Sequence, residues 1–379
     1  MLSELRQKID NIDDQIVALY RERMEISKEV AKEKNKSGKG VTNYLREKEV
    51  LNRVTEMVDD DIKAYTKQVF ETLFDTSKAY QLRYIDGTSK SREKIEKALQ
   101  NSDEPFPVKA YVACQGIDGA YSNIATERLF TLSNIMYFKN FEGVFNAVEK
   151  GLCKYGVLPI ENSIAGSVNT VYDLMREHNF HIVKSIKLRI QHSILSKKGV
   201  KLEDVKEIIS HEQAINQCSK FIKSLGDVKV TVCANTAIAA KMVAESDRCD
   251  VACISSKECT GIYDLELLRS NVQNADNNFT RFICISKDLE IYKGANKISI
   301  MMTVPHESGS LNKILNKFST LNLNLTKLES RPLENTNFEF MFYFDFEADL
   351  HDKEILNLIT ELDNEAQDFI FLGNYSEVV

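Results

Sequence analysis

The sequence predicts a multidomain protein with an all-α first domain, an α/β second domain and a small α+β domain at its end. The chain has 379 residues, more than one ordinary hydrophobic core accommodates, so two or three domains are expected. Apolar positions recur at helical steps through the first eighty-odd residues, whereas farther on short apolar runs alternate with helical patterns. We place the domains at 1–88, 108–287 and 296–379, with a linker at 89–107.

The first domain is predicted to be helical throughout. Glycine is rare in it, and Gly38 with Gly40 marks the break between a first helix and a second that starts near Asn43. A third helix carries apolar residues at helical spacing up to Tyr80. The polar stretch 89–107 follows and contains two prolines, which suits a linker.

The second domain reads as α/β with a largely parallel sheet, because apolar runs of strand length alternate with helical segments. Its expected strands lie at 110–114, 155–160, 207–210, 228–233, 251–256 and 281–286. The last domain reads as strand, helix, strand, strand, helix and strand, at 297–304, 309–322, 325–330, 338–346, 352–364 and 368–373. This order describes a ferredoxin-like module.

Composition favours a cytoplasmic protein without nucleic-acid or membrane partners. The net charge is -7 and the pI is near 5.6, with lysines interspersed among acids. No apolar run is long enough to span a bilayer, and no basic and apolar leader opens the chain. The eight cysteines lack the spacing of a zinc site, so we expect reduced thiols and no metal.

An arginine occupies the apolar seam of the first helix. Positions spaced by three and four are apolar at Leu5, Ile9, Ile12, Ile16, Leu19, Ile26 and Val30, and the missing position is Arg23. A guanidinium keeps its proton, so here it meets an anionic ligand, reaches past the seam to solvent, or pairs with a neighbouring glutamate. The seam alone leaves these explanations open.

Further polar residues project from the helical domain where core is expected or lie close to such positions. They are Arg6, Lys34, Arg46, Glu47, Ser77 and Gln81. Several cations with a glutamine and a serine, all directed inward, suit a small dianion.

The segments LRQKIDNIDDQIVALYRERMEISKEVAKEK, YLREKEVL and SKAYQ together resemble the all-helical chorismate mutase family. The resemblance implies an intertwined homodimer whose sites bind both carboxylates of chorismate and rearrange it to prephenate. It assigns Arg6 to the partner subunit, and Arg23, Lys34, Arg46, Glu47, Ser77 and Gln81 to one subunit. Arg23 and Arg6 would clamp carboxylates, and Glu47 would hold the substrate hydroxyl. Lys34 and Gln81 would donate to the ether oxygen whose bond breaks.

Such a rearrangement is unimolecular, so it needs a folded substrate and stabilised charge on the departing oxygen, and neither a nucleophile nor a cofactor. Asn43 departs from the family pattern, in which aspartate is common. The departure concerns the fine contacts of the second helix.

Three loops of the α/β domain carry small and polar residues where ligands are expected. Glu161, Asn162 and Ser163 lie at the carboxyl end of a strand, the edge at which α/β sheets bind ligands. The loops at 116–122 and 235–236 precede helical patterns, so their N–H groups either bind an anion or serve as ordinary caps. A dinucleotide site is disfavoured because the first glycine of the fingerprint is missing.

The segments GVLPIENSIAGSV, ISHEQAINQC, NTAIAA and NNFTRF resemble prephenate dehydratase over about residues 108 to 287. The resemblance implies two α/β lobes like those of periplasmic binding proteins, with the site in the cleft between them. There the ring hydroxyl of prephenate leaves as water and the ring carboxylate as carbon dioxide. The residues expected to line this cleft are Glu161, Asn162, Ser163, Ser210 and Gln217.

Thr280 is the key catalytic residue by this resemblance. A threonine hydroxyl is a weak acid, so we expect it to act as a positioned hydrogen-bond donor. Arg281 has two explanations, an ion pair behind the cleft or a carboxylate-binding role. The sequence departs from the family at Cys114, Glu212 and Asn274, all in loops beside the expected site.

The last domain resembles an ACT regulatory domain at two places, Gly309, Ser310 and Leu311 at a helix start and Glu329, Ser330, Arg331 and Pro332 at a strand end. The resemblance implies phenylalanine as an effector, held between two paired modules. A module that only dimerises the enzyme is the alternative, since fold alone does not confer ligand binding. Ser308 departs from the usual proline.

Together these resemblances predict a bifunctional enzyme of phenylalanine biosynthesis, with chorismate and prephenate as substrates, no cofactor and a homodimer or larger homo-oligomer. One alternative is a mutase fused to a prephenate dehydrogenase, which the missing dinucleotide fingerprint disfavours. A second is a non-enzymatic amino-acid sensor, which would leave the mutase residues and Thr280 without a purpose.

Overall fold

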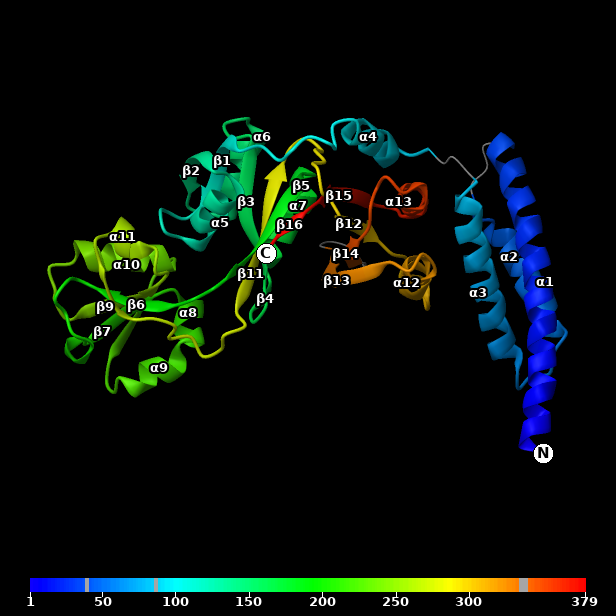
Figure 1. Ribbon diagram of the computed structural model, residues 1–379, viewed down its shortest axis with the longest axis horizontal. Helices are drawn as coiled ribbons and strands as arrows, with labels where there is room; N and C mark the ends of the chain where they lie inside the picture. Colours follow the sequence, from blue (N-terminus) through cyan, green and yellow to red (C-terminus); the bar gives the residue numbers. More distant parts are fainter. Residues whose placement is uncertain (38–40, 85–87, 334–339) are drawn as a thin grey trace. The chain divides into compact units, whose positions relative to one another are not determined.

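The computed structural model describes residues 1–37, 41–84, 88–333 and 340–379, which divide into two compact units (Figure 1). The first unit joins Met1–Leu99 to Asn296–Phe371, and the second joins Gln100–Ala295 to Leu372–Val379. The N-terminal helices therefore share a unit with the C-terminal module, a grouping that the sequence did not predict. The predicted break at Gly38 and Gly40 lies outside the described residues.

Helices form the N-terminal part of the first unit, as predicted. They are α1 (Leu2–Ser37), α2 (Tyr44–Glu56), α3 (Lys63–Leu82) and α4 (Lys90–Leu99). Asn43 caps α2, because its side-chain Oδ1 accepts a hydrogen bond from the Arg46 N–H at 3.1 Å. An aspartate at this position would make the same cap.

The C-terminal part has the predicted ferredoxin-like order. Its elements are β12 (Lys297–Thr303), α12 (Ser310–Thr320), β13 (Asn324–Pro332), β14 (Phe340–Glu347), α13 (Lys353–Glu365) and β15 (Phe369–Tyr375). The sheet order is β13-β14-β12-β15, with β14 antiparallel to both β13 and β12. Phe318 of α12 stacks on Phe344 of β14 at 5.5 Å between ring centroids, so the helices cover an aromatic core.

The predicted linker at 89–107 contains α4, which corrects the sequence prediction. Ile95 of α4 is fully buried, and Arg92 donates from Nη1 to Asn357 Oδ1 of α13 at 2.6 Å. The helix forms because one apolar face of a charged segment packs on the C-terminal module. A prediction based on local composition missed this helix because most of its residues are charged.

The second unit has two α/β lobes. The first lobe contains β1 (Lys109–Gln115), α5 (Tyr121–Leu129), β2 (Leu132–Phe138), α6 (Phe141–Glu149), β3 (Tyr155–Asn162), β4 (Gly166–Ser167), α7 (Asn169–His178), β5 (His181–Arg189), β11 (Phe279–Ser286) and β16 (Glu377–Val378). Its sheet has the order β16-β5-β11-β3-β1-β2, with β4 beside β3. The sheet is mixed rather than largely parallel, because β11 returns from the other lobe and runs antiparallel to β3 and β5.

The second lobe is inserted between β5 and β11. It contains β6 (Ser193–Ser196), the 3-10 helix η1 (Leu202–Asp204), β7 (Glu207–Ser210), α8 (Glu212–Gln217), α9 (Ser219–Ser224), β8 (Lys229–Val232), α10 (Thr236–Glu245), β9 (Val251–Ser255), α11 (Cys259–Ile262) and β10 (Glu266–Arg269). Its sheet order is β10-β6-β9-β7-β8. The chain crosses between the lobes at 190–192 and again at 270–278, and Ile190 and His192 of the first crossing line the cleft.

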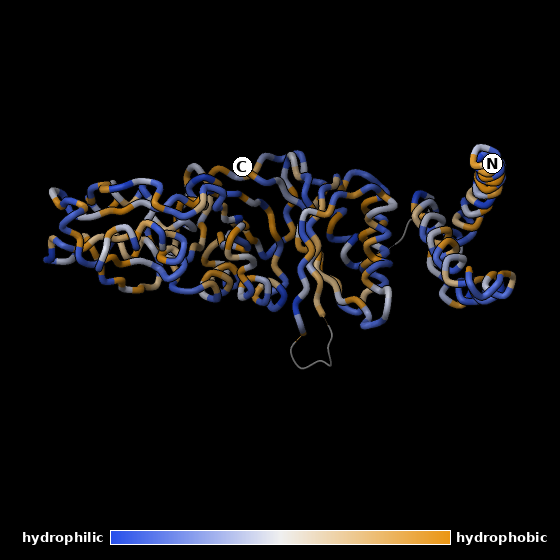
Figure 2. Tube along the Cα trace, turned by 90° about the horizontal axis from the view of Figure 1, so that it is seen from below, coloured by the Kyte–Doolittle hydropathy of each residue, from blue (hydrophilic) through white to orange (hydrophobic). Residues whose placement is uncertain are grey.

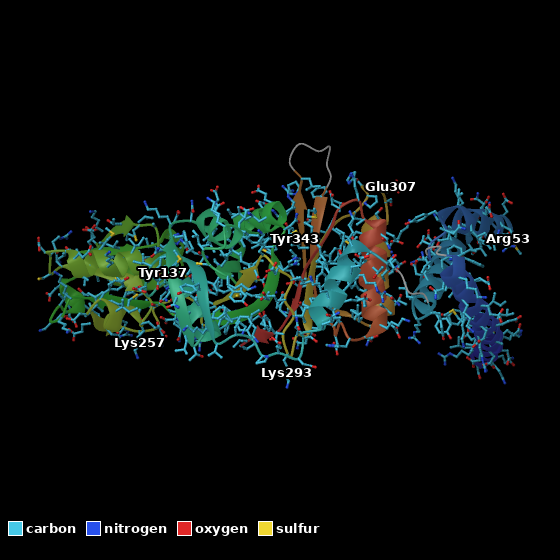
Figure 3. The ribbon with its side chains drawn as sticks, turned by 90° about the horizontal axis from the view of Figure 1, so that it is seen from above. Arg53, Tyr137, Lys257, Lys293, Glu307 and Tyr343 are labelled. Carbon is cyan, nitrogen blue, oxygen red and sulfur yellow. The ribbon has the colours of Figure 1, made fainter. Side chains whose placement is uncertain are left out.

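Apolar side chains along α1 remain exposed in the single chain. The seven seam residues from Leu5 to Val30 are between 41% and 67% exposed, and Figure 2 shows apolar positions in orange in the N-terminal helix. By contrast, Tyr343 is buried within the C-terminal module, while Lys257 and Lys293 are exposed to solvent (Figure 3). A long apolar face of this kind is typical of surfaces that bind another protein chain.

Among the described residues, no helix is both long enough and apolar enough to cross a bilayer.

Candidate active sites

Arg23 lies in a cavity of about 350 Å³ formed by residues of α1 and by Gln81 of α3. The cavity is lined by Leu19, Glu22, Arg23, Ile26, Ser27, Val30 and Gln81. Arg23 Nη1 donates to the Leu73 carbonyl at 3.0 Å and to the Ser77 hydroxyl, so α3 fixes the guanidinium. Burial lowers the pKa of Arg23 from its ordinary value, although an arginine stays protonated at neutral pH. Within the part of the chain that the structure describes, no carboxylate pairs with this charge.

Lys34 and Gln81 meet at the end of the same site. Lys34 Nζ donates to the Val41 carbonyl and, at 3.3 Å, to Gln81 Oε1. An ammonium only donates, so Gln81 must present its oxygen to Lys34, and its amide NH2 faces elsewhere. Burial lowers the pKa of Lys34, while the Glu47 carboxylate opposes that shift. The two predicted donors are thus neighbours, as the expected role requires.

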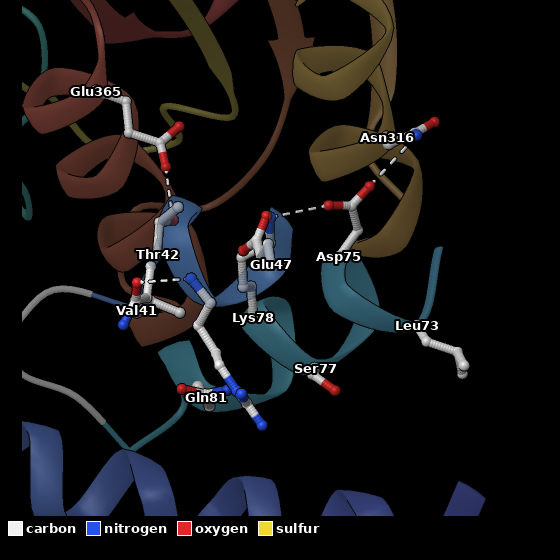
Figure 4. A network of polar contacts seen from close by, with 12 residues as sticks. Val41, Thr42, Glu47, Leu73, Asp75, Ser77, Lys78, Gln81, Asn316 and Glu365 are labelled. Atoms are coloured by element: carbon white, nitrogen blue, oxygen red, sulfur yellow. Dashed lines mark hydrogen bonds and ion pairs between the residues drawn. The ribbon is translucent and has the colours of Figure 1, made fainter. Parts of the chain in front are cut away.

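Glu47 belongs to a polar network between the helical domain and the C-terminal module (Figure 4). Lys78 Nζ lies 3.3 Å from Glu47 Oε1 and 3.1 Å from Asp75 Oδ1. Burial alone would lower the pKa of Lys78, but the two carboxylates raise it above its ordinary value. Asn316 of α12 donates to Asp75 Oδ2 at 3.5 Å, which extends the network into the C-terminal module.

Two predicted residues lie outside this group in the single chain. Arg46 is exposed on α2 and pairs with Glu49 at 2.9 Å. Arg6 lies in the second turn of α1, and about 25 Å of α-helix separates it from Arg23. Arg6 of the same chain therefore cannot reach the cavity around Arg23.

A second cavity, of about 500 Å³, lies in the cleft between the lobes of the second unit. Its lining includes Asn162, Gln217 and Thr280 among the predicted residues, with Ser122, His192 and Thr236. Of the described residues that line it, none is a lysine, arginine, aspartate or glutamate. The helices α5, α7 and α10 begin at its wall. Helix starts carry partial positive charge and free N–H groups, so this neutral cavity suits an anionic ligand.

Asn162 positions the hydroxyl of Thr280. Asn162 Oδ1 accepts from the backbone N–H groups of Ile164 and Ala165, at 3.1 Å and 2.9 Å. Its Nδ2 must therefore face the other way, where it donates to Thr280 Oγ1 at 2.8 Å. Because Oγ1 accepts this bond, the Thr280 O–H can donate to a molecule in the cavity.

The Asn162 amide also belongs to a hydrogen-bond network that joins the two lobes and the two crossings between them. Asn162 Nδ2 also donates to Asn278 Oδ1 at 2.7 Å, and Asn278 Nδ2 donates to Gln217 Oε1 at 3.0 Å. His192 Nε2 lies 2.9 Å from the same Gln217 oxygen. Burial lowers the pKa of His192, and the Gln217 contact only partly opposes that effect. A neutral His192 that donates from Nε2 fits this geometry.

Three residues predicted to line the cleft have other contacts. Ser210 is fully buried and donates to the Ile254 carbonyl at 2.7 Å, so it holds β7 to β9. Ser163 Oγ bonds the Asn277 carbonyl and the Phe279 N–H, which fastens the second crossing to β3. Glu161 pairs with Arg281 at 3.3 Å. None of the three is among the described residues that line the cavity.

Two family models match the two parts of the chain that contain these cavities. The model described as Chorismate mutase type II matches residues 5–82, and the model described as Prephenate dehydratase matches residues 112–290. The bifunctional chorismate mutase/prephenate dehydratase of Escherichia coli (strain K12) is 30% identical, and the match covers 99% of this chain and 96% of the relative. This chain belongs to that bifunctional family. It carries both the chorismate mutase and the prephenate dehydratase activity, in phenylalanine biosynthesis.

Two further comparisons concern the dehydratase and the module after it. Arogenate dehydratase/prephenate dehydratase 2 of Arabidopsis thaliana is 37% identical, over 70% of this chain and 72% of the relative. The crystal structure of the prephenate dehydratase of Arthrobacter aurescens in complex with L-Phe matches with a TM-score of 0.64 and 24% identity. That match covers 71% of this chain and 90% of the other, and it shows the shared fold.

The residues predicted to bind an effector lie at two places in the C-terminal module. Gly309 precedes α12 with φ of 85°, and Ser310 with Leu311 forms the first turn of the helix. Residues 329–332 end β13, which is an edge strand of the sheet. The edge of a sheet is a common place for pairing with a strand of another chain.

Sequence reasoning missed three residues that support the enzyme's sites. Lys78 follows Ser77 on α3. The only feature of the sequence that pointed to Lys78 was its charge next to Ser77, a residue already predicted to belong to the mutase site. His192 and Asn278 lie at the two crossings between the dehydratase lobes. A polar Gln191-His192 pair that separates two apolar runs was the available signal for the first crossing. This pair indicates a crossing between lobes only once it is known which strands belong to which lobe.

Proposed function

We propose that the mutase reaction takes place around Arg23, Lys34 and Gln81, and that a second subunit completes this site. Arg23 binds a carboxylate of chorismate, while Lys34 and Gln81 donate to the ether oxygen as its bond to carbon breaks. Glu47, held by Lys78, accepts from the substrate hydroxyl. The reaction moves no proton to the protein, so preorganised charge and a folded substrate supply the acceleration.

Mutase activity is expected to fall as the pH rises, and the fall should occur at a pH below the ordinary lysine pKa. Burial lowers the pKa of Lys34, and once the ammonium loses its proton the ether oxygen loses a charged donor. In Lys34→Arg the group stays protonated, so whatever activity remains should persist to higher pH. The measurement is kcat/KM for chorismate from about pH 7 to about pH 10. A variant that loses activity over the same pH interval as the wild type would contradict the assignment.

A homodimer accounts for both the apolar seam of α1 and the position of Arg6. The seam residues are more than two-fifths exposed, and Arg6 is too far from the cavity of its own chain. A partner that covers the seam would bring its own Arg6 to the cavity around Arg23. Higher oligomers through the C-terminal module are compatible with this arrangement.

Ile12→Lys is expected to weaken the dimer and to lower mutase activity, because it places a charge on the seam. Asp14→Lys introduces the same lysine on the opposite face of α1 and is the matched control. Light scattering gives the oligomeric state, and prephenate formation gives the activity. A monomeric Ile12→Lys protein with full mutase activity would overturn the shared site.

We further propose that Thr280 serves the dehydratase reaction as a donor to the departing hydroxyl. The ring carboxylate leaves as carbon dioxide, and its bonding electron pair enters the ring. The ring hydroxyl, hydrogen-bonded to Thr280, takes up a proton from solvent and leaves as water. The supporting observation is the Asn162 amide, which occupies the acceptor side of Thr280 Oγ1 and directs its O–H away. The helix starts around the neutral cavity would bind the substrate carboxylates.

Phenylalanine is the proposed effector of the C-terminal module. The Arthrobacter dehydratase that shares the fold is known in complex with L-Phe. Gly309 to Leu311 and Glu329 to Pro332 supply a helix start and an edge strand that suit an amino acid's two charged groups.

One experiment tests these assignments together. The purified protein is given chorismate without nucleotide, and prephenate and phenylpyruvate are measured with and without phenylalanine. Phenylpyruvate formation that phenylalanine suppresses is the expected result. If phenylalanine leaves the rate of phenylpyruvate formation unchanged, the effector proposal is rejected. If prephenate accumulates and no phenylpyruvate forms, the assignment of the dehydratase site to the cleft is rejected.

A further inference from the structure

The last residues of the chain join the dehydratase sheet beside β5, the strand next to β11, which carries Thr280. β15 begins in the first unit and ends at Tyr375, and residues from Leu372 onward belong to the dehydratase unit. β16 then pairs in parallel with β5, and the C-terminus lies beside this strand (Figure 1). Gly373 makes the approach possible, because a Cβ at this position would collide with the Ile182 carbonyl oxygen. Residues 372–379, here called the tail, are thus a structural part of the first lobe.

Strand register places a charged row beside the row that contains Thr280. Thr280 pairs with Asn162 of β3 and Leu188 of β5. The next residue, Arg281, pairs with Glu161 and Lys187 on the same two strands. Successive side chains on a strand point to opposite faces, so the charged row lies behind the cleft.

The tail supplies a second carboxylate to Arg281. Glu377 Oε2 lies 3.0 Å from Arg281 Nε, and Glu377 Oε1 lies 3.0 Å from Lys187 Nζ. Arg281 also donates from Nη2 to the hydroxyl of Tyr375, whose ring lies 5.9 Å from the guanidinium carbon. The Arg281 side chain is 4% exposed and that of Glu377 is 11% exposed, so water screens these contacts little. Ser185 donates to Glu377 Oε2 at 3.1 Å and fixes the carboxylate further.

We infer that Glu377 and Tyr375 are positioning residues for the dehydratase reaction, acting through Arg281 on Thr280. The inference rests on the proposed role of Thr280. Arg281 joins β11 to β3 through Glu161, directly behind the Asn162 to Thr280 bond. The tail carboxylate balances the buried guanidinium, so it holds β11 and β3 in the register that this bond requires. Because the tail continues β15, it also links the C-terminal module covalently to this position.

The test uses the full-length enzyme with Glu377→Gln, Glu377→Asp and Tyr375→Phe. Glu377→Gln keeps the shape of the side chain but removes its charge. Its dehydratase kcat is expected to fall by about ten-fold or more, with KM for prephenate much less affected, since small misplacements of a catalytic group are costly. Glu377→Asp should recover part of the loss. Mutase activity of the same samples should stay within about two-fold, and Asp288→Asn, an exposed carboxyl of the same lobe, is the matched control.

A double variant separates positioning from general stability. If the tail acts through Thr280, then adding Glu377→Gln to Thr280→Ala causes no further loss of kcat. A further loss of the same factor in the double variant, or an unchanged kcat in Glu377→Gln, would overturn the inference. If Glu377→Gln does not fold, which loss of both activities would reveal, Tyr375→Phe decides: a lowered kcat supports the inference, and a wild-type kcat overturns it. Full dehydratase activity in Thr280→Ala would instead reject the proposed catalytic role itself.

Discussion

Thr280→Ala is expected to lower the dehydratase kcat by about 10²- to 10³-fold, the range that one positioned hydrogen-bond donor to a developing charge contributes. The substitution removes the hydroxyl that the Asn162 amide orients toward the cavity at 2.8 Å. The ring hydroxyl would then depart without a donor. Thr280 lines the cavity and is 9% exposed, and alanine removes only its hydroxyl and one methyl group, so the fold should persist. Phenylpyruvate formed from added prephenate is the measurement.

Two comparisons make this result specific to the hydroxyl. Thr280→Ser retains a donor at the same place and should keep most of the activity, whereas Thr280→Val retains the shape without the donor and should lose it. The mutase activity of each sample reports whether the chain is folded. A Thr280→Val enzyme as active as the wild type would show that the hydroxyl does not take part in the reaction.

The sequence predicted the elements whose signal is local. The period of α1, the apolar runs of β3, β9 and β11, and the βαββαβ order of the C-terminal module all appear in the structure. Long-range facts were beyond such reasoning. The helix α4 depends on burial of Ile95 in the same unit as α13, and the mixed sheet depends on the return of β11 from the second lobe. Neither partner is adjacent in sequence.

The same division applies to the sites. Thr280, Asn162, Lys34 and Gln81 were predicted from motifs with a family resemblance, and each of them lies beside one of the two cavities or contacts a residue that does. The position of Ser210 in the sheet interior could not be read from its place at a strand end, because one residue of register decides which face it takes. The ambiguity over Arg281 is resolved in favour of ion pairs behind the cleft, and its partner Glu377 lies almost a hundred residues away.

Arg23→Ala is expected to lower the mutase kcat/KM for chorismate by about 10²-fold or more, because a substrate carboxylate loses its fixed cation. The guanidinium is held by Leu73 and Ser77 within a cavity that also contains Gln81. Holding Arg23 in this position buries part of its charge, which is unfavourable, as the lowered pKa of Arg23 indicates. In the described part of the chain no carboxylate offsets that cost, which is the arrangement expected when the substrate brings the anion. Prephenate formation from chorismate is the measurement.

Arg21→Ala provides the matched control, because Arg21 is exposed two positions away on the opposite face of α1. It should leave the activity near the wild-type value. Arg23→Lys keeps the charge but loses the planar fork that matches a carboxylate, so it should restore only part of the activity. If Arg23→Ala lowered the mutase and dehydratase activities equally, the arginine would support the fold. A loss confined to the mutase reaction, and larger for alanine than for lysine, would identify the charge on the seam as the carboxylate ligand.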